Sequence, residues 1–226
     1  MGDNSVLEKM IQVGVVPVVR TESEKEAFDA VEALMKGGIP IAEITMTTPN
    51  AITIIEKLLQ KFGKRLICGA GTVTDISQCL AVLDAGSQFI VTPTLNTDII
   101  RRCKDFNVCV IGGAFTPTEI LTTWQAGANA VKIFPAAAVD GPKYLGMIHE
   151  PLPHIPLVPT GGVNLENLPK FLKSGALFVG AGGDLLPQDE LKSGNIEAIT
   201  NKARQYLSAI QKARNQTAKT PAKHEN

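Results

Sequence analysis

The chain has 226 residues, 44% hydrophobic and 19% charged, which suffices for one sizeable core but is too short for two ordinary large domains. Its 22 lysines and arginines balance 22 aspartates and glutamates, which argues against nucleic acid or a membrane surface as partner. No apolar run reaches the roughly 18 residues that span a bilayer, and residues 1–5 do not resemble an export signal, so a cytoplasmic protein is expected.

The predicted elements alternate between short apolar runs and longer stretches of helical periodicity. Asn4–Gln12 is predicted to be a short N-terminal amphipathic helix that plugs the bottom of a barrel. The eight strands predicted after it are Val13–Val19, Ile39–Thr45, Leu66–Cys68, Gln88–Thr92, Val108–Ile111, Ala130–Phe134, Leu157–Pro159 and Leu177–Val179. The helices predicted between them include Glu22–Lys36, Asn50–Phe62, Ile76–Asp84 and Thr97–Phe106.

Eight such alternations predict an α/β protein with a small (β/α)8 TIM barrel, and an open doubly wound sheet is the alternative. An internal repeat favours closure of the sheet into a barrel. Gly38, Gly86, Gly127 and Gly175 each end a predicted helix just before a strand, and they follow one another at intervals of 48, 41 and 48 residues, about two βα units. Glycine is expected there because it readily adopts the left-handed conformation of a helix C-terminal cap.

The C-terminal end of the chain differs in composition from the rest. Apolar residues become rare after Ser208, so we expect a single domain over residues 1–213 and a disordered tail over residues 214–226.

The cysteines and histidines give no sign of a disulfide framework or a metal site. The cysteines lack a Cys-x-x-Cys pair and are expected to be buried free thiols: Cys68, Cys79, Cys103 and Cys109. The histidines include no helix-spaced pair beside a carboxylate: His149, His154 and His224. Chemistry without a metal is therefore preferred.

Two charged residues interrupt otherwise apolar strands. Five residues after the glycine of each repeat lie Glu43, Val91, Lys132 and Gly180, which are expected at equivalent heights on alternate strands of the barrel. An acid and a base would then share one layer near the carboxyl ends of the strands. Burial lowers the pKa of a lysine, and its neutral amine can form a Schiff base while the carboxylate moves protons. The alternatives are a buried structural ion pair and side chains that point outward.

Glycine-rich segments follow the last two predicted strands, where barrels of this kind commonly bind phosphate. They are Thr160-Gly161-Gly162 and Gly180-Ala-Gly182-Gly183. Glycine lets backbone N–H groups converge on an anion, although each loop alone could be only a tight turn.

Five motifs occur in order along the chain: Glu43-Ile-Thr, Gly69-Ala-Gly-Thr-Val, Thr92-Pro, Lys132-Ile-Phe-Pro-Ala and Pro159-Thr-Gly-Gly-Val. With them the chain resembles, from about Val13 to Ala209, the class I 2-keto-3-deoxy-6-phosphogluconate (KDPG) / 4-hydroxy-2-oxoglutarate (KHG) aldolase family. The resemblance implies a homotrimeric (β/α)8 barrel without metal or other cofactor. It also implies a keto acid and an aldehyde as partners, and a place in carbohydrate metabolism of the Entner–Doudoroff type.

The resemblance further implies roles for individual residues. Lys132 falls on the Schiff-base lysine of the family, and Glu43 falls on its general acid/base. The substrate-pocket positions correspond to Thr72, Pro93, Phe134 and Thr160. Gly161 and Gly162 fall on the phosphate-loop glycines, and Gly182 and Gly183 are expected to complete that site.

Two positions depart from the family pattern. Many members have an arginine four residues after the catalytic glutamate, where this chain has Thr47; we expect Arg20 to hold the substrate carboxylate instead. Many members have a serine where this chain has Gly183, followed here by Asp184, whose carboxylate would repel phosphate if it pointed inward. We expect Asp184 to face outward or cap the next helix, which favours a phosphorylated substrate.

The expected reaction is the reversible cleavage of a 4-hydroxy-2-oxo acid, KDPG or KHG, to pyruvate and an aldehyde. Two other classes stay open, since a fold does not fix a function. One is a phosphosugar isomerase, epimerase or synthase in which Glu43 is a base and Lys132 an electrostatic partner. The other is a non-catalytic sugar-acid-binding oligomer.

Overall fold

The structure is a computed structural model that describes residues 3–218. Its strands are β1 (Val15–Val19), β2 (Ile41–Thr45), β3 (Ile67–Gly71), β4 (Phe89–Val91), β5 (Cys109–Ala114), β6 (Ala130–Ile133), β7 (Leu157–Pro159) and β8 (Val179–Ala181). The α-helices are α1 (Asp3–Val13), α2 (Glu24–Lys36), α3 (Ala51–Phe62), α4 (Ile76–Asp84), α5 (Thr97–Asp105), α6 (Pro117–Gln125), α7 (Gly141–His149), α8 (Leu168–Lys173), α9 (Gln188–Ser193) and α10 (Ile196–Ala218). Two short 3-10 helices, Gly63–Arg65 and Ala136–Ala138, complete the described elements.

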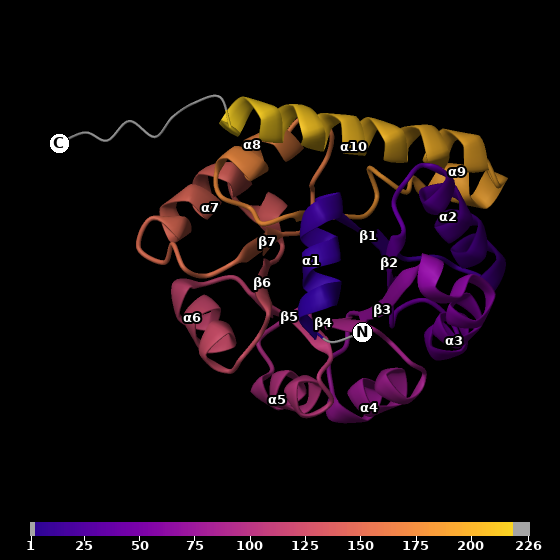
Figure 1. The fold of residues 1–226 in the computed structure, drawn as a ribbon, viewed down its shortest axis with the longest axis horizontal. Coiled ribbons are helices and arrows are strands. Elements are labelled where there is room, and N and C mark those ends of the chain that lie inside the picture. The colour runs from indigo at the N-terminus through magenta and orange to yellow at the C-terminus, as the bar shows by residue number, and fades with distance from the viewer. Residues whose placement is uncertain (1–2, 219–226) are drawn as a thin grey trace.

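The eight strands form one parallel sheet in the order β7-β6-β5-β4-β3-β2-β1-β8. Single bridges from Leu157 to Ala176 and from Thr160 to Gly180 join the two ends, β7 and β8. Helices surround the strands on the outside, as Figure 1 shows, so nearly every strand residue is buried. The predicted (β/α)8 barrel is confirmed, and the open sheet is excluded.

The glycines of the repeat occupy the conformation expected of them. Gly38, Gly86, Gly127 and Gly175 have φ values of 96°, 86°, 99° and 93°, which lie in the left-handed region. Each therefore turns the chain from a helix into the following strand without the steric cost that a Cβ would bring.

The N-terminal helix α1 lies across the centre of the ring of helices in Figure 1 and contacts β1 and β5. It buries Val6 and Met10 and leads through Gly14 directly into the start of β1, so it closes the amino-terminal end of the barrel as predicted. The prediction that β1 begins at Val13 is wrong, because α1 continues to that residue and Gly14, at φ 85°, ends the helix.

The expected tail requires a correction at its beginning. Residues 214–218 are helical, because α10 continues to Ala218; residues 219–226 lie outside the described residues. Arg214 donates hydrogen bonds to the backbone carbonyls of Ile11 and Gln12 at the end of α1. The last turns of α10 are thus held by contacts with α1 that residue composition does not reveal.

The four cysteines are buried and free, as expected. Among residues 3–218, no helix is long and apolar enough to cross a membrane.

Candidate active site

Glu43 and Lys132 meet inside the barrel. Glu43 lies on β2 and Lys132 on β6, and both are almost fully buried, with 3% and 4% of their surface exposed. Lys132 Nζ is 4.0 Å from Glu43 Oε1, too far for a hydrogen bond but close enough for electrostatic interaction. The side chains therefore point inward and share a layer, which excludes the outward alternative.

The surroundings of Glu43 favour a carboxyl group that can change its protonation state. Oε1 is buried and has no hydrogen-bond partner among residues 3–218. Burial raises the pKa of Glu43 above its ordinary value, and the charges of Lys132 and Arg20 oppose this rise. A carboxyl group with a raised pKa is suited both to donate and to accept protons.

Glycine on the neighbouring strand makes room for this carboxyl group. A Cβ at Gly71 of β3 would lie 1.9 Å from Glu43 Oε1, so a side chain there would displace the carboxylate. Gly69 on the same strand leaves similar room for Phe89 of β4. β3 is therefore built of small residues where its neighbours need its space.

A cavity of about 860 Å³ opens at the carboxyl ends of the strands. Apart from Glu43, whose Oε1 is 4.0 Å from Lys132 Nζ, all the predicted site residues line it: Arg20, Thr72, Pro93, Lys132, Phe134, Thr160, Gly161, Gly162, Gly182 and Gly183. Parallel strands bring these residues to one edge of the barrel although they are distant in sequence.

Arg20 lies at the rim of this cavity, directly after β1. Its side chain is exposed and forms no ion pair with any residue in the described range 3–218. Thr47 also lines the cavity, and its hydroxyl is 2.9 Å from that of Thr45. A single free guanidinium at the rim is suited to bind a carboxylate, since it can donate two parallel hydrogen bonds.

Thr72 has a strained backbone. Its φ of 57° is in the left-handed region, where a β-branched residue is an outlier. Such a conformation costs on the order of 1–3 kcal/mol and is found mostly at functional sites. The strain therefore supports a functional position for Thr72 at the cavity wall.

The remaining predicted pocket residues are held by close packing. Lys132 Nζ lies 5.1 Å from the centre of the Phe134 ring, in cation–π range. A Cβ at Gly113 would lie 2.4 Å from the backbone carbonyl carbon of Pro93, and one at Gly180 would lie 2.3 Å from the Thr160 hydroxyl. Glycine on β5 and β8 thus permits the approach of both residues.

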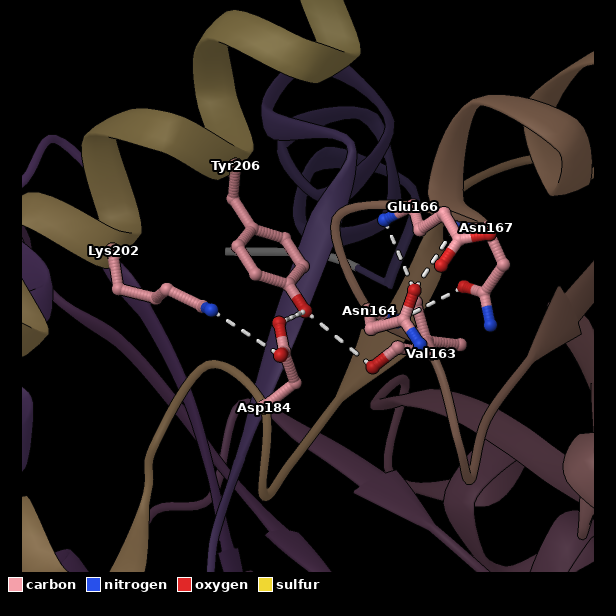
Figure 2. A network of polar contacts seen from close by, with 7 residues as sticks. All are labelled: Val163, Asn164, Glu166, Asn167, Asp184, Lys202 and Tyr206. Atoms are coloured by element: carbon pink, nitrogen blue, oxygen red, sulfur yellow. Dashed lines mark hydrogen bonds and ion pairs between the residues drawn. The ribbon is translucent and has the colours of Figure 1, made fainter.

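Asp184 lines the cavity, but it does not cap a helix as expected. Its carboxylate accepts hydrogen bonds from Tyr206, at 2.7 Å, and from Lys202, at 3.2 Å, which both lie on α10 (Figure 2). The helix that follows, α9, begins at Gln188 after Pro187. Of the two orientations expected for Asp184, the helix cap is not formed, because its carboxylate binds Tyr206 and Lys202 of α10 instead.

Sequence reasoning missed several residues of the cavity wall. They are Val18, Thr21, Glu22, Val163, Asn164, Leu186 and Gln188. Val18 lies within β1, and the others follow β1, β7 or β8, a position that could have identified them. Glu22 forms an ion pair with Lys192 at 2.8 Å, and Gln188 donates a hydrogen bond to the carbonyl of Arg20.

The arrangement combines a buried amine, a nearby carboxyl group and an exposed guanidinium in one cavity. An amine in this setting can attack a carbonyl carbon, and the carboxyl group can carry the protons that the addition requires. Among residues 3–218, no group of three potential metal-ligating side chains occurs.

Comparison with known proteins shows which family the chain belongs to. The sequence profile of the family described as KDPG and KHG aldolase matches residues 6–202. The 2-dehydro-3-deoxy-phosphogluconate aldolase of Dickeya dadantii is 33% identical over 202 residues, which cover 89% of this chain and 94% of that protein. The 2-dehydro-3-deoxy-6-phosphogalactonate aldolase of Escherichia coli is 32% identical over 200 residues, covering 88% and 95%.

A solved structure shows the same fold. The KDPG aldolase of Legionella pneumophila, crystallised with pyruvate captured at low pH as a covalent carbinolamine intermediate, superposes with a TM-score of 0.82. It is 30% identical, and the match covers 88% of this chain and 96% of that one. Together with the buried lysine and glutamate, these matches show that the chain belongs to the KDPG and KHG aldolase family.

Proposed function

We propose that the protein is a class I aldolase that reversibly cleaves a 4-hydroxy-2-oxo acid to pyruvate and an aldehyde. The observation that carries this proposal is the approach of Lys132 Nζ to within 4.0 Å of Glu43 Oε1 in the buried layer at the floor of the cavity. Membership of an aldolase family supports it independently.

In this mechanism the Lys132 amine attacks the C2 carbonyl of the keto acid. A C–N bond forms, the carbonyl oxygen takes up a proton from the Glu43 carboxyl group, and a carbinolamine results. Loss of water from the carbinolamine gives an iminium ion. Arg20 at the rim binds the substrate carboxylate and orients C2 toward the amine.

The Glu43 carboxylate then removes the proton of the C4 hydroxyl group. The C3–C4 bond breaks, its electron pair moves into the iminium to give an enamine, and the aldehyde is released. Protonation at C3 and hydrolysis release pyruvate and restore the amine. Because Glu43 must both donate and accept protons, the rise of its pKa through burial assists each turnover.

The test is chemical trapping of the covalent intermediate. Borohydride added with pyruvate is expected to reduce the imine and to add one reduced pyruvate to the protein, located at Lys132 by peptide mass spectrometry. Lys132→Ala should abolish the adduct, and Lys173→Ala, which changes a lysine of α8, should retain it. An adduct that persists in Lys132→Ala contradicts the proposal.

We further propose a phosphorylated six-carbon acid, KDPG, as the preferred substrate. The Dickeya dadantii and Escherichia coli relatives described above are named for a phosphogluconate and a phosphogalactonate substrate. The cavity supports this preference because Gly161-Gly162 and Gly182-Gly183 both line it, in loops next to the bridge between Thr160 and Gly180. KHG, which carries a carboxylate at the far end, is the alternative substrate, as in the relative named KHG/KDPG aldolase.

We propose a homotrimer and a cytoplasmic location for this enzyme, acting in the degradation of sugar acids. Exposed apolar side chains on the helices support association, with Phe106 at 49% and Met147 at 63% of their surface exposed. Four free thiols support a reducing compartment.

A further inference from the structure

Three side chains behind the glycine loops form a network that we call the Asp184 clamp: Asp184, Lys202 and Tyr206. Tyr206 donates a hydrogen bond to Asp184 Oδ2 at 2.7 Å, and Lys202 donates one to Oδ1 at 3.2 Å. In Figure 2 both donors reach from α10 toward the carboxylate. Each carboxylate oxygen is therefore bound by a different residue of the same helix.

The Asp184 clamp contacts both loops at the glycine-rich end of the cavity. Asp184 belongs to the loop after β8, and the Tyr206 hydroxyl also lies 3.4 Å from the carbonyl oxygen of Val163 in the loop after β7. Tyr206 is fully buried, so its position is fixed by the packing of α10. A rigid side chain thus supports the two loops from behind.

The two loops carry free donors. Across residues 3–218, the backbone N–H groups of Gly162 and Gly183 have no hydrogen-bond acceptor. Free N–H groups that converge at a cavity wall are suited to bind an anion. A carboxylate that moved among them would accept these hydrogen bonds itself and would repel a phosphate.

We propose that Lys202 and Tyr206 are positioning residues for the substrate phosphate: they hold the Asp184 carboxylate on α10 and keep the loop N–H groups open for phosphate oxygens. This role rests on the aldolase function proposed above. It makes a helix that does not line the cavity a determinant of substrate choice.

The experiment compares KDPG with its unphosphorylated analogue, 2-keto-3-deoxygluconate, in Tyr206→Phe and Lys202→Met. Release of Asp184 is expected to raise KM for KDPG about five- to tenfold, in the range of one ordinary lost hydrogen bond. kcat for both substrates and KM for the unphosphorylated substrate should stay unchanged. Lys212→Met, about 15 Å further along the same helix, is the matched control and should behave as the wild type.

The same substitutions in an Asp184→Asn background test whether Lys202 and Tyr206 act through Asp184 or whether Lys202 attracts the phosphate directly. If Lys202 and Tyr206 act through the Asp184 charge, neither substitution changes KM for KDPG once that charge is absent. If Lys202 attracts phosphate directly, Lys202→Met raises KM for KDPG equally in both backgrounds, and the proposed role is wrong. Equal losses for both substrates, or no loss for either, contradict it as well.

Binding of inorganic phosphate, measured by calorimetry, gives a readout that needs no turnover. Tyr206→Phe and Lys202→Met should weaken phosphate binding, and Asp184→Asn should restore it. If the wild type releases no pyruvate from either substrate, the aldolase proposal fails while phosphate binding still decides the role of the clamp. Phosphate affinity that is unchanged in both variants overturns it.

Discussion

Arg20 is the residue proposed to bind the substrate carboxylate, and its charge also acts on Glu43. It lies at the rim of the cavity, and its charge lowers the pKa of Glu43 against the effect of burial. Its two roles can be separated, because one acts through hydrogen bonds to a carboxylate and the other only through charge.

Arg20→Met is expected to raise KM for the keto acid about 10- to 100-fold, because hydrogen bonds to a charged group are worth about 1.5–3 kcal/mol. It should also move the acid limb of kcat/KM to higher pH, since loss of the positive charge raises the pKa of Glu43 further and the carboxylate protonates earlier as pH falls. Steady-state kinetics across the pH range measure both effects. Arg20→Lys keeps the charge and should leave the acid limb of the pH profile where it is in the unaltered protein. If the acid limb does not move in Arg20→Met either, the Arg20 charge does not influence the pKa of Glu43.

A substitution at Gly183 is expected to improve binding of the substrate phosphate. A Cβ built at this position meets no atom within 4 Å, and the backbone there needs no positive φ. Gly183→Ser should therefore add a hydroxyl donor without strain and lower KM for KDPG about two- to tenfold, the worth of one hydrogen bond. Kinetics with the unphosphorylated analogue should not change.

Gly183→Ala is the control for this substitution, because it adds the Cβ without the hydroxyl. Equal effects of serine and alanine would mean that the added hydroxyl does not contact the phosphate.

At the scale of elements, the contact between α1 and α10 connects the two ends of the described chain. Arg214 donates to the carbonyls of Ile11 and Gln12, which lie in the last turn of α1 and have no partner within that helix. Arg214→Ala should therefore lower the free energy of unfolding by about 1–3 kcal/mol.

Thermal denaturation measures this loss, and hydrogen exchange should place the increased exchange in α1. Arg214→Lys is the control: a lysine offers no planar fork for two carbonyls and should recover only part of the stability. Aldolase activity should be retained in both, since α1 lies at the other end of the barrel from the cavity. An unchanged melting temperature in Arg214→Ala would refute the stabilising role of this contact.

The strands show what could be predicted from sequence and why. Apolar runs and the helix-ending glycines located all eight strands, and β7 was predicted to the residue. β3 extends beyond Cys68 to Gly71, and β5 extends beyond Ile111 to Ala114. Glycines in these extensions leave space for the Glu43 carboxylate and the Pro93 backbone, and strand propensity cannot reveal a requirement set by a neighbouring strand.

Some residues of the candidate site could also be predicted from the sequence, and others could not. Glu43 and Lys132 could be predicted because a charge inside an apolar strand is conspicuous in a sequence. The partners of Asp184 could not be predicted, because Lys202 and Tyr206 belong to a helix whose pattern gives no indication that it faces that loop. The sequence therefore indicated only that Asp184 faces outward or caps the following helix.

At the scale of the whole molecule, the proposed trimer predicts a mass in solution of about three times 24.1 kDa. Multi-angle light scattering at micromolar concentration measures it directly. A charge placed on the exposed apolar surface, as in Met147→Glu, should weaken association, whereas Leu121→Gln serves as a milder, uncharged change on another helix. A monomer of about 24 kDa in the unaltered protein would contradict the proposal.

Helix α1 closes the amino-terminal end of the barrel, so the cavity is closed on that side. Lys132 lies at its closed end. In the proposed mechanism, pyruvate attached to that lysine would lie deepest, and the aldehyde would lie between it and the mouth. The aldehyde must therefore depart first in cleavage and arrive last in condensation, so the reaction has a compulsory order. Product inhibition should show it: pyruvate should compete with the keto acid for the free enzyme, and an aldehyde that competed in the same way would rule the order out.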